Sequence, residues 1–370
     1  MLKSPIAIEL TSQQQAIVAH NDGPALVFAV AGAGKTTAIE HRIARLVQEG
    51  VFDAGRILAT TFNRKNVTEL QSRLHRHPGC DKVQVMTLNA LGQAVIRQAF
   101  NSGLIPYLQK KAFDSVDKAN EEILAKTRSK TFERKLSFSN ELETLDREDF
   151  LNCVSQWKGN LSYCDLQGSK LPKEIQKFAN QADAPTQFAW YLELYKLFEE
   201  TRKELGLFTF DDQVMMGWEL LATSEALRSN FQQRYDCVLV DEFQDVNKAQ
   251  AEMLDLLVEP HKNYMAVGDD DQTIYEWRGA NPNYILGFAK RYSAKEYFMT
   301  ENFRCSASQV ILANRVIAQN KQRKEKQMQL TKGFEGRTTV QVHASSEAMA
   351  AEIAKNVKQS HLRSVPLKDM

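Results

Sequence analysis

Short apolar runs, each ending in a polar or glycine-rich tip, recur near the start of the chain and again in its second half. They occupy residues 25–30, 57–59, 83–86, 237–240 and 264–267. Continuous apolarity over such short lengths is typical of parallel strands that are buried on both faces. We therefore predict a parallel sheet, with ligands bound at the carboxyl ends of its strands.

Helical periodicity lies between these runs. In residues 36–48 the apolar side chains recur on one helical face, and Gly50 follows as a capping residue. Because strand, loop and helix alternate in this way, the pattern indicates a doubly wound α/β fold.

Residues 96–205 interrupt this alternation with helical patterns alone. A cluster of basic residues there is interleaved with acids and includes Lys110, Lys111, Lys126, Arg128, Lys130, Arg134 and Lys135. Such a pattern fits a surface that binds DNA, and it fits an ordinary solvated helix face equally well. We predict an inserted helical domain over residues 96–205, within a first α/β domain formed by residues 1–95 and 206–292.

A further α/β pattern begins near Tyr297. It predicts a strand over residues 338–342 and a helix over residues 347–358. We assign residues 293–370 to the start of a second α/β domain.

Composition limits the kinds of binding site and the cellular location that we expect for the protein. Lys and Arg number 47 against 46 Asp and Glu, so nucleic acid would have to bind in a local basic groove. The five cysteines have no paired spacing, which argues against a disulfide framework and a zinc site. Residues 25–31 form the most apolar stretch and are too short to span a bilayer. With no signal-peptide pattern at the start, we expect a cytoplasmic protein without a membrane partner.

The strongest local signal is the run AVAGAGKTT at residues 29–37. A glycine-rich turn between strand and helix lets backbone N–H groups approach phosphate oxygens, and the helix N-terminus adds positive potential. Lys35 would reach the β- and γ-phosphates, and the Thr36 hydroxyl would hold Mg²⁺. The predicted phosphate-binding residues are Ala31, Gly32, Ala33, Gly34, Lys35, Thr36 and Thr37. Ala29 stands where the general pattern has its first glycine.

Two adjacent carboxylates, Asp241 and Glu242, follow the apolar run at residues 237–240. In a metal-assisted hydrolase Asp241 would support Mg²⁺ and Glu242 would polarise the attacking water. Acidic residues after a strand also serve as ordinary helix caps. The presence of the glycine-rich loop favours the catalytic interpretation.

Further segments stand in a fixed order along the chain. They are LTSQQ (10–14), TFNRK (61–65), LFTFDD (207–212), VLVDEFQD (238–245), VGDDDQTIYEWRGA (267–280) and TENFR (300–304). In this order they resemble motifs of the UvrD/Rep/PcrA branch of superfamily-one DNA helicases. The resemblance implies a RecA-like phosphate-loop NTPase domain with a helical insertion, followed by the start of a second RecA-like domain.

The same resemblance implies roles at an ATP site. Gln14, or Gln13 in the neighbouring register, would bond the adenine edge, and Phe303 would stack on the base where the family usually has tyrosine. Gln272 would sense the γ-phosphate and link the ATP site to DNA. Arg304 would reach the γ-phosphate as an arginine finger, and its alternative is a surface salt bridge.

The resemblance also implies a path for single-stranded DNA. Its predicted residues are Phe62, Lys65, Asn89, Tyr275, Trp277 and Arg278. Aromatic faces suit a single strand because every base can stack on them. Asn89 stands where the family has histidine. The alternative for Phe62 and Tyr275 is a place in the core.

By resemblance, we expect an ATP-dependent DNA helicase or translocase that uses ATP and Mg²⁺, moves 3′ to 5′ and meets single strands and duplex junctions. Motifs V and VI of the family are not found in the 370 residues. We therefore expect a truncated motor, which is either a fragment, a truncated gene product, or one part of a split enzyme whose missing half comes from a partner chain. Its turnover would be poor, since one arginine finger is worth about 10³–10⁵ in rate. The alternative is an ATP-gated module that binds single strands without motor activity.

Overall fold

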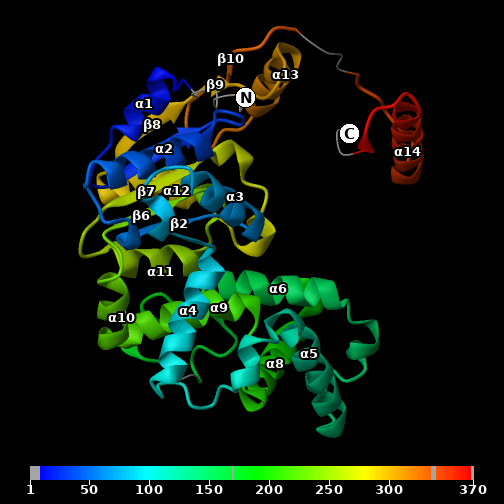
Figure 1. Ribbon diagram of the computed structural model, residues 1–370. Coiled ribbons are helices and arrows are strands. Elements are labelled where there is room, and N and C mark those ends of the chain that lie inside the picture. Colours follow the sequence, from blue (N-terminus) through cyan, green and yellow to red (C-terminus); the bar gives the residue numbers. More distant parts are fainter. Residues whose placement is uncertain (1–8, 169–170, 335–338, 368–370) are drawn as a thin grey trace.

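A six-stranded parallel sheet forms the centre of the upper part of the molecule (Figure 1) in the computed structural model, which describes residues 9–168, 171–334 and 339–367. The strand order is β3-β2-β6-β7-β1-β8, and every neighbouring pair is parallel. The strands are β1 (Ala25–Ala29), β2 (Ile57–Thr60), β3 (Gln84–Met86), β6 (Cys237–Val240), β7 (Tyr264–Gly268) and β8 (Lys295–Met299). The five predicted apolar runs are confirmed as strands, and the predicted α/β class is confirmed.

Strand β8 lies beyond residue 292, where the sequence pattern suggested that the first domain ends. It is paired with β1 from Ala25–Lys295 to Ala29–Met299. As an edge strand it buries only Tyr297 and Met299, and its first residue is an exposed lysine. A strand with one buried face carries alternation in place of a continuous apolar run, so its membership of the first sheet was not visible in the pattern.

Alternate residues of each strand point into two separate cores. Val27 and Leu239 face helices α1, α2 and α3, whereas Leu26 and Val238 face α4, α11 and α12. The helices that cover the sheet are α1 (Ser12–Val18), α2 (Lys35–Gln48), α3 (Arg64–Leu74), α11 (Lys248–Val258) and α12 (Asn283–Tyr292). Both faces are therefore covered, as a parallel sheet requires.

A helical part lies below the sheet (Figure 1). It consists of α4 (Leu88–Asn101), α5 (Val116–Glu133), α6 (Arg147–Gly159), α7 (Lys173–Gln176), α8 (Tyr191–Leu205), α9 (Phe210–Thr223) and α10 (Glu225–Gln232), with the short pair β4 (Ser162–Tyr163) and β5 (Asn180–Gln181). Helix α4 begins before the expected limit at residue 96, and α9 lies wholly beyond the expected limit at residue 205. Both helices contribute to the core that lies against the sheet, so the helical part shares its core with the α/β part.

A buried ion network joins three of these helices. The Lys158 ammonium of α6 lies 2.8 Å from Asp212 of α9 and 2.7 Å from Glu199 of α8. Arg202 of α8 adds contacts to both acids. Because an unpaired charge inside a protein is costly, this network favours one relative placement of the three helices.

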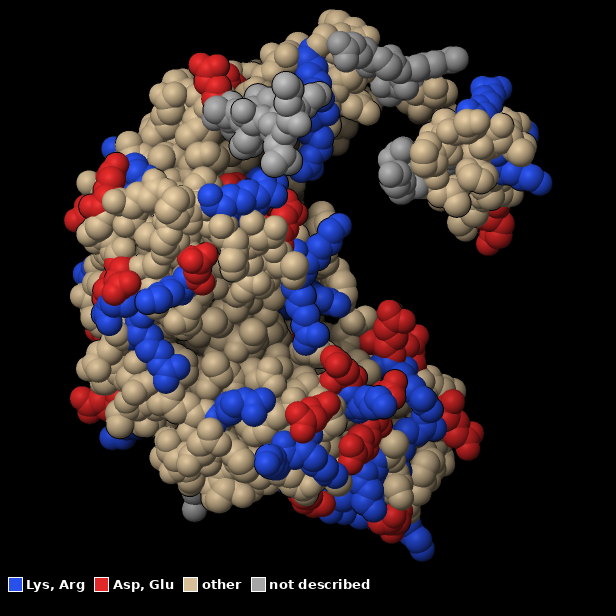
Figure 2. Space-filling model, viewed as in Figure 1, with Lys and Arg blue, Asp and Glu red and all other residues tan. Residues whose placement is uncertain are grey.

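Charges of both signs are interspersed over the helical part (Figure 2). Among the predicted basic residues, Lys130 is paired with Glu204 and Arg134 with Glu200, both on α8. These two cations therefore join neighbouring helices. The exposed Arg134 fits the solvated-face interpretation, whereas Lys130 is buried and does not.

After the sheet, the chain forms β9 (Glu301–Asn302), α13 (Ala307–Ile317), β10 (Gln329–Leu330) and α14 (Ser346–Leu362). The predicted helix over residues 347–358 is confirmed as part of α14. The predicted strand over residues 338–342 is wrong where it is described: residue 338 lies outside the described residues, and residues 339–342 form no strand. Val340 and Val342 are exposed there. An apolar sequence becomes a strand only where a neighbouring strand supplies hydrogen bonds.

Within the described part of the chain, none of the helices is both long enough and apolar enough to cross a membrane.

Helices α4 and α9 cross at two glycines. A Cβ atom at Gly217 would lie 2.9 Å from the Cα atom of Gly92, and one at Gly92 would overlap the carbonyl oxygen of Gln213. We expect Gly92→Ala to lower the free energy of unfolding by roughly 1–3 kcal/mol, because the backbones must separate. Urea unfolding measures this change. Gly287→Ala is the control, since open space surrounds Gly287 on α12, and equal stability of the two variants would contradict the prediction.

Candidate nucleotide and nucleic-acid site

The glycine-rich loop connects β1 to α2 at the carboxyl edge of the sheet. Gly32 and Gly34 have φ values of 69° and 83°, in the left-handed region that favours glycine. A Cβ atom at Gly32 would lie 2.6 Å from that of Arg304, and one at Gly34 would lie 2.7 Å from Nε2 of Gln14. Two residues predicted for the nucleotide site therefore lie against this loop.

The segment LTSQQ (10–14), at the start of α1, contacts the loop. Gln14 donates from Nε2 to the Ala33 carbonyl oxygen at 3.1 Å, and its Oε1 accepts from the backbone of Thr11 at 3.1 Å. Gln13 turns elsewhere and exchanges two hydrogen bonds with Thr300. Of the two registers, the structure brings Gln14 to the loop. Its amide can still make further hydrogen bonds, because each end has capacity for two.

Asn302 is a site residue that the sequence reasoning missed. It is fully buried, and it donates from Nδ2 to the Ala31 carbonyl oxygen at 2.6 Å. Its Oδ1 accepts from the backbone N–H groups of Arg304 and Cys305. Next to it, the Phe303 N–H donates to the Gly32 carbonyl oxygen at 3.0 Å. The central position of Asn302 in TENFR was the available signal.

The side chains of Phe303 and Arg304 remain open to solvent. Phe303 is 43% exposed, and Arg304 is also exposed beside Gly32. No ion pair of Arg304 is found among the described residues, so the surface salt bridge considered for it is not formed there.

The two carboxylates that follow β6 lie near the loop lysine. Lys35 Nζ is 2.6 Å from Oε2 of Glu242, whose backbone is left-handed with a φ of 54°. Burial, followed by the charge of Glu242, raises the pKa of Asp241 to about 7, while Lys35 opposes this shift. A cation beside Asp241 would stabilise its charged form.

The donor atoms at this edge fit Mg²⁺. The Asp241 carboxylate and the Thr36 hydroxyl are hard oxygen donors of the kind that Mg²⁺ prefers, and such sites complete their shell with water and phosphate oxygens. Thr36 lies in the first turn of α2, directly after Lys35. Asp241 lies close enough to Lys35 for the lysine charge to lower its pKa.

A hydrogen-bonded chain leads from Lys35 to Gln272. Gln244 donates from Nε2 to Glu242 at 3.0 Å and accepts at Oε1 from the backbone of Asp269 at 3.0 Å. The Asp269 carboxylate accepts from Nε2 of Gln272 at 2.6 Å. The structure therefore brings together residues that were predicted from segments far apart in sequence.

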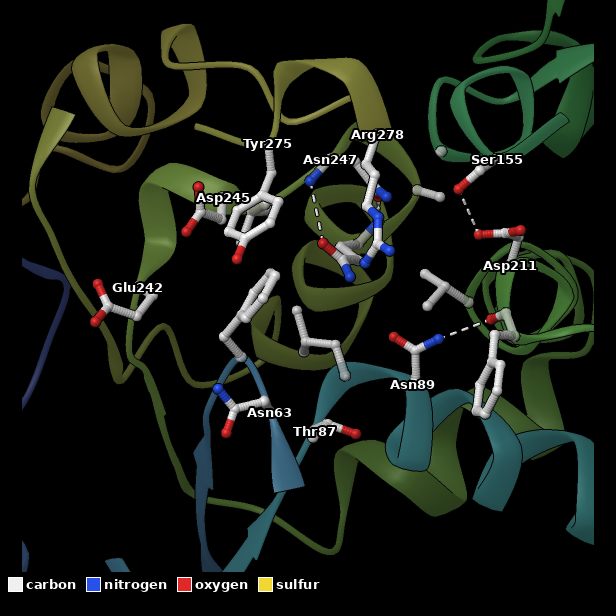
Figure 3. A pocket seen from close by; sticks show the side chains of 18 of the residues that line it. Asn63, Thr87, Asn89, Ser155, Asp211, Glu242, Asp245, Asn247, Tyr275 and Arg278 are labelled. Atoms are coloured by element: carbon white, nitrogen blue, oxygen red, sulfur yellow. Dashed lines mark hydrogen bonds between the residues drawn. The ribbon is translucent and has the colours of Figure 1, made fainter. Parts of the chain in front are cut away.

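A cleft of about 490 Å³ opens between the edge of the sheet and the helical part (Figure 3). Phe62 and Tyr275 stack there with ring centroids 4.7 Å apart, and Tyr275 lies 6.5 Å from the Trp277 ring. The Arg278 guanidinium lies 4.6 Å from the centre of the Trp277 ring. Phe62 is 38% and Trp277 47% exposed, and Tyr275 is half-buried, so none of these rings is a core residue.

The predicted polar residues of the DNA path do not all reach this cleft. Asn89 lines it, with Nδ2 donating to the Phe210 carbonyl oxygen at 2.7 Å. Lys65 lies on a separate shallow surface of α3, beside Arg73 and Arg76. Its neighbour Arg64 lines the cleft instead, because successive residues at the start of a helix point in different directions.

The sequence patterns also did not identify two acidic residues on the wall of the cleft, Asp245 and Asp211. Burial, followed by the charge of Glu242, raises the pKa of Asp245 to about 6. Burial also raises the pKa of Asp211, whose Oδ1 accepts a hydrogen bond from Ser155 at 2.8 Å (Figure 3). A raised pKa lessens the negative charge that this wall would present to a phosphate backbone.

The parallel sheet and the loop between β1 and α2 define an α/β protein of RecA-like fold. Its family follows from comparison with known proteins: a model of the "UvrD/REP helicase N-terminal domain" family matches residues 10–293, and the chain belongs to this family.

Similar proteins carry helicase names. The chain is 31% identical to "ATP-dependent DNA helicase PcrA" of Leuconostoc citreum over 95% of its length and 44% of that protein. It is 29% identical to "Putative ATP-dependent DNA helicase YjcD" of Bacillus subtilis over 87% of its length and 40% of that protein. It is 28% identical to "ATP-dependent DNA helicase Rep" of a Buchnera aphidicola strain over 95% of its length and 51% of that protein. The chain thus spans about half or less of the length of these relatives.

The raised pKa of Asp241 predicts a pH-dependent effect of Asp241→Asn on stability. The pKa is about 7 in the folded chain against an ordinary 3.8, so the folded state holds an extra proton between these values. Wild-type stability therefore falls as the pH rises through this range, and a neutral asparagine avoids the loss. In the absence of nucleotide, we expect Asp241→Asn to raise the free energy of unfolding at pH 8 by about 1–4 kcal/mol.

Urea unfolding at pH 5 and pH 8 measures this difference. The gain should be smaller at pH 5, where most Asp241 side chains keep their proton. Asp114→Asn, an exposed carboxylate of the helical part, is the control. An equal effect of Asp241→Asn at both pH values would contradict the assignment.

Proposed function

We propose that this chain binds ATP with Mg²⁺ at the edge of its sheet, hydrolyses it, and couples this reaction to binding and 3′-to-5′ movement on single-stranded DNA. The main support is the hydrogen-bonded chain that runs from Lys35 through Glu242, Gln244 and Asp269 to Gln272. It connects the glycine-rich loop with the segment that carries Tyr275, one of the aromatic residues of the cleft. The names of the relatives, "ATP-dependent DNA helicase", support the same reaction.

In this proposal, the contact between Lys35 and Glu242 is the one that Lys35 makes when no nucleotide is bound. Phosphate oxygens compete with the carboxylate for the Lys35 ammonium, while the backbone N–H groups of residues 31–36 surround the phosphates. Glu242 is then free to accept a proton from the attacking water. Thr36 and Asp241 would hold Mg²⁺, and such an ion would supply positive charge to balance that of the phosphates.

In this proposal, Arg304 and Phe303 approach the nucleotide from the other side of the loop. Asn302 anchors their segment to the loop through the Ala31 carbonyl group. Since both side chains are exposed, they can turn toward a nucleotide without leaving other partners. Phe303 would cover the base, and Arg304 would approach the γ-phosphate.

The aromatic cleft is the proposed DNA site. Phe62 and Tyr275 in the cleft, and the exposed Trp277 beside Tyr275, offer ring faces for bases. Arg64 and Arg278 supply positive charge for phosphates. Because every base has a face that can stack on an aromatic ring, such rings favour single strands of any sequence.

Lys35→Ala tests the nucleotide site. We expect it to weaken binding of a fluorescent ATP analogue roughly 10- to 100-fold, because a charged hydrogen-bond partner of the phosphates is removed. Titration by fluorescence measures the affinity. Lys82→Ala, at an exposed lysine of the α/β part, is the matched control. Unchanged affinity in Lys35→Ala would refute the site assignment.

ATP turnover with and without single-stranded DNA separates a motor from the ATP-gated binding module. Turnover that DNA stimulates in the wild type and that Lys35→Ala abolishes would support hydrolysis coupled to DNA. ATP binding without any turnover would favour the binding module.

Trp277→Ala tests the DNA site. We expect affinity for a labelled oligothymidylate to fall about 5- to 150-fold, since one stacked base contributes about 1–3 kcal/mol. Affinity for the ATP analogue should stay unchanged. Fluorescence anisotropy measures the DNA affinity, and Phe132→Ala, an exposed ring of the helical part, is the control. Equal loss of both affinities would show that Trp277 has a structural role.

A further inference from the structure

Three consecutive carboxylates follow strand β7. Asp269, Asp270 and Asp271 each place an oxygen within 4.8 Å of the others, and the first two side chains are buried. Like charges at such distances repel one another strongly away from bulk water. Their arrangement therefore requires a positive charge nearby.

Lys326 supplies this charge from a distant part of the sequence. Its Nζ lies 3.0 Å from Asp269, 2.6 Å from Asp270 and 2.8 Å from Asp271. Its side chain is only 1% exposed. A lysine ammonium has three N–H donors, so each carboxylate can receive one of them. The ammonium occupies the position among the three oxygens that a cation would otherwise take.

The segment around Lys326, between α13 and β10, is fastened to the same carboxylates. Arg323 donates to both oxygens of Asp271 at 2.8 and 2.7 Å, and its guanidinium also donates to the Lys326 carbonyl oxygen at 2.8 Å. The backbone N–H of Lys324 donates to Asp270 at 2.7 Å. Several contacts thus hold the Lys326 ammonium in one place.

Asp269 connects this cluster to Gln272. One oxygen of its carboxylate faces Lys326, and the other accepts the hydrogen bond from Gln272. Its backbone N–H is bound to Gln244, the next member of the chain that leads to Lys35. The orientation of the Asp269 carboxylate, and with it the direction of the Gln272 amide, depends on where the Lys326 ammonium lies.

We propose that Lys326 is a positioning residue for Gln272, holding it through Asp269 in the geometry that couples the nucleotide site to the DNA cleft. The inference rests on the proposed function, since it concerns how ATP and DNA binding influence each other. Without the ammonium, the three carboxylates separate and Gln272 loses its fixed partner. Each ligand should still bind, but binding of one should no longer alter the affinity for the other.

The experiment measures the affinity for oligothymidylate with and without a non-hydrolysable ATP analogue. We expect the analogue to change DNA affinity roughly 5-fold or more in the wild-type chain, the usual scale of coupling between two sites. In Lys326→Met this change should shrink to less than about 2-fold, with ATP-analogue affinity retained within about 3-fold. Lys326→Arg keeps the positive charge and should restore a substantial part of the coupling.

Lys324→Met is the matched control. It removes a lysine of the same segment whose ammonium contacts Glu296 and not the three aspartates, so coupling should stay at the wild-type level. If Lys326→Met fails to fold, Lys326→Met/Asp270→Asn removes one negative charge together with the positive one and should fold without coupling.

The outcomes distinguish the inference from the proposed function. Wild-type coupling in a folded variant that lacks Lys326 would overturn the inference. Loss of ATP affinity in Lys326→Met without rescue by arginine would also overturn it, because Lys326 would then be merely structural. A wild-type chain that binds neither ATP nor DNA would instead refute the proposed function.

Discussion

The rest of this structure depends on one constraint: the carboxyl ends of strands β1, β6 and β7 lie at the same edge of the sheet. In a parallel sheet, neighbouring strands end on the same side, so the residues that follow them become neighbours whatever their distance in sequence. Lys35, Glu242 and Asp269 follow three such strands and join one hydrogen-bonded chain. The register of the strands therefore sets the geometry of the candidate site.

A second feature of the molecule is that several charged side chains away from solvent are paired with side chains of opposite charge. Lys35 is paired with Glu242, Lys326 with three aspartates, and Lys158 with Asp212. Each pair connects segments that are more than 50 residues apart. Since an isolated buried charge is costly, each pair favours one arrangement of the elements that it joins. A ligand that takes one partner away leaves the other charge without compensation and so has a direct means of changing the structure.

The helical part forms one wall of the cleft and shares a hydrophobic core with the sheet. Helices α4 and α9 approach closely enough that only glycine fits at Gly92 and Gly217. The end of α6 also lies close to the segment that carries Tyr275 and Trp277, because a Cβ atom at Gly159 would be 3.1 Å from the Arg278 carbonyl oxygen. If the segment that carries Tyr275 and Trp277 moved, the helical part would therefore have to move with it or repack.

The sequence alone determined the parallel strands, the glycine-rich loop, the family and the set of segments that meet at the sheet edge, because periodicity and motif spacing are local properties of the chain. Only the tertiary structure decided that β8 belongs to the first sheet, that residues 339–342 form no strand and that Arg64 reaches the cleft in place of Lys65. The anchoring by Asn302 and the contacts of Lys326 were likewise invisible in the pattern. The physical reason is the same in each case: pairing, burial and side-chain direction depend on neighbours that lie far away in sequence.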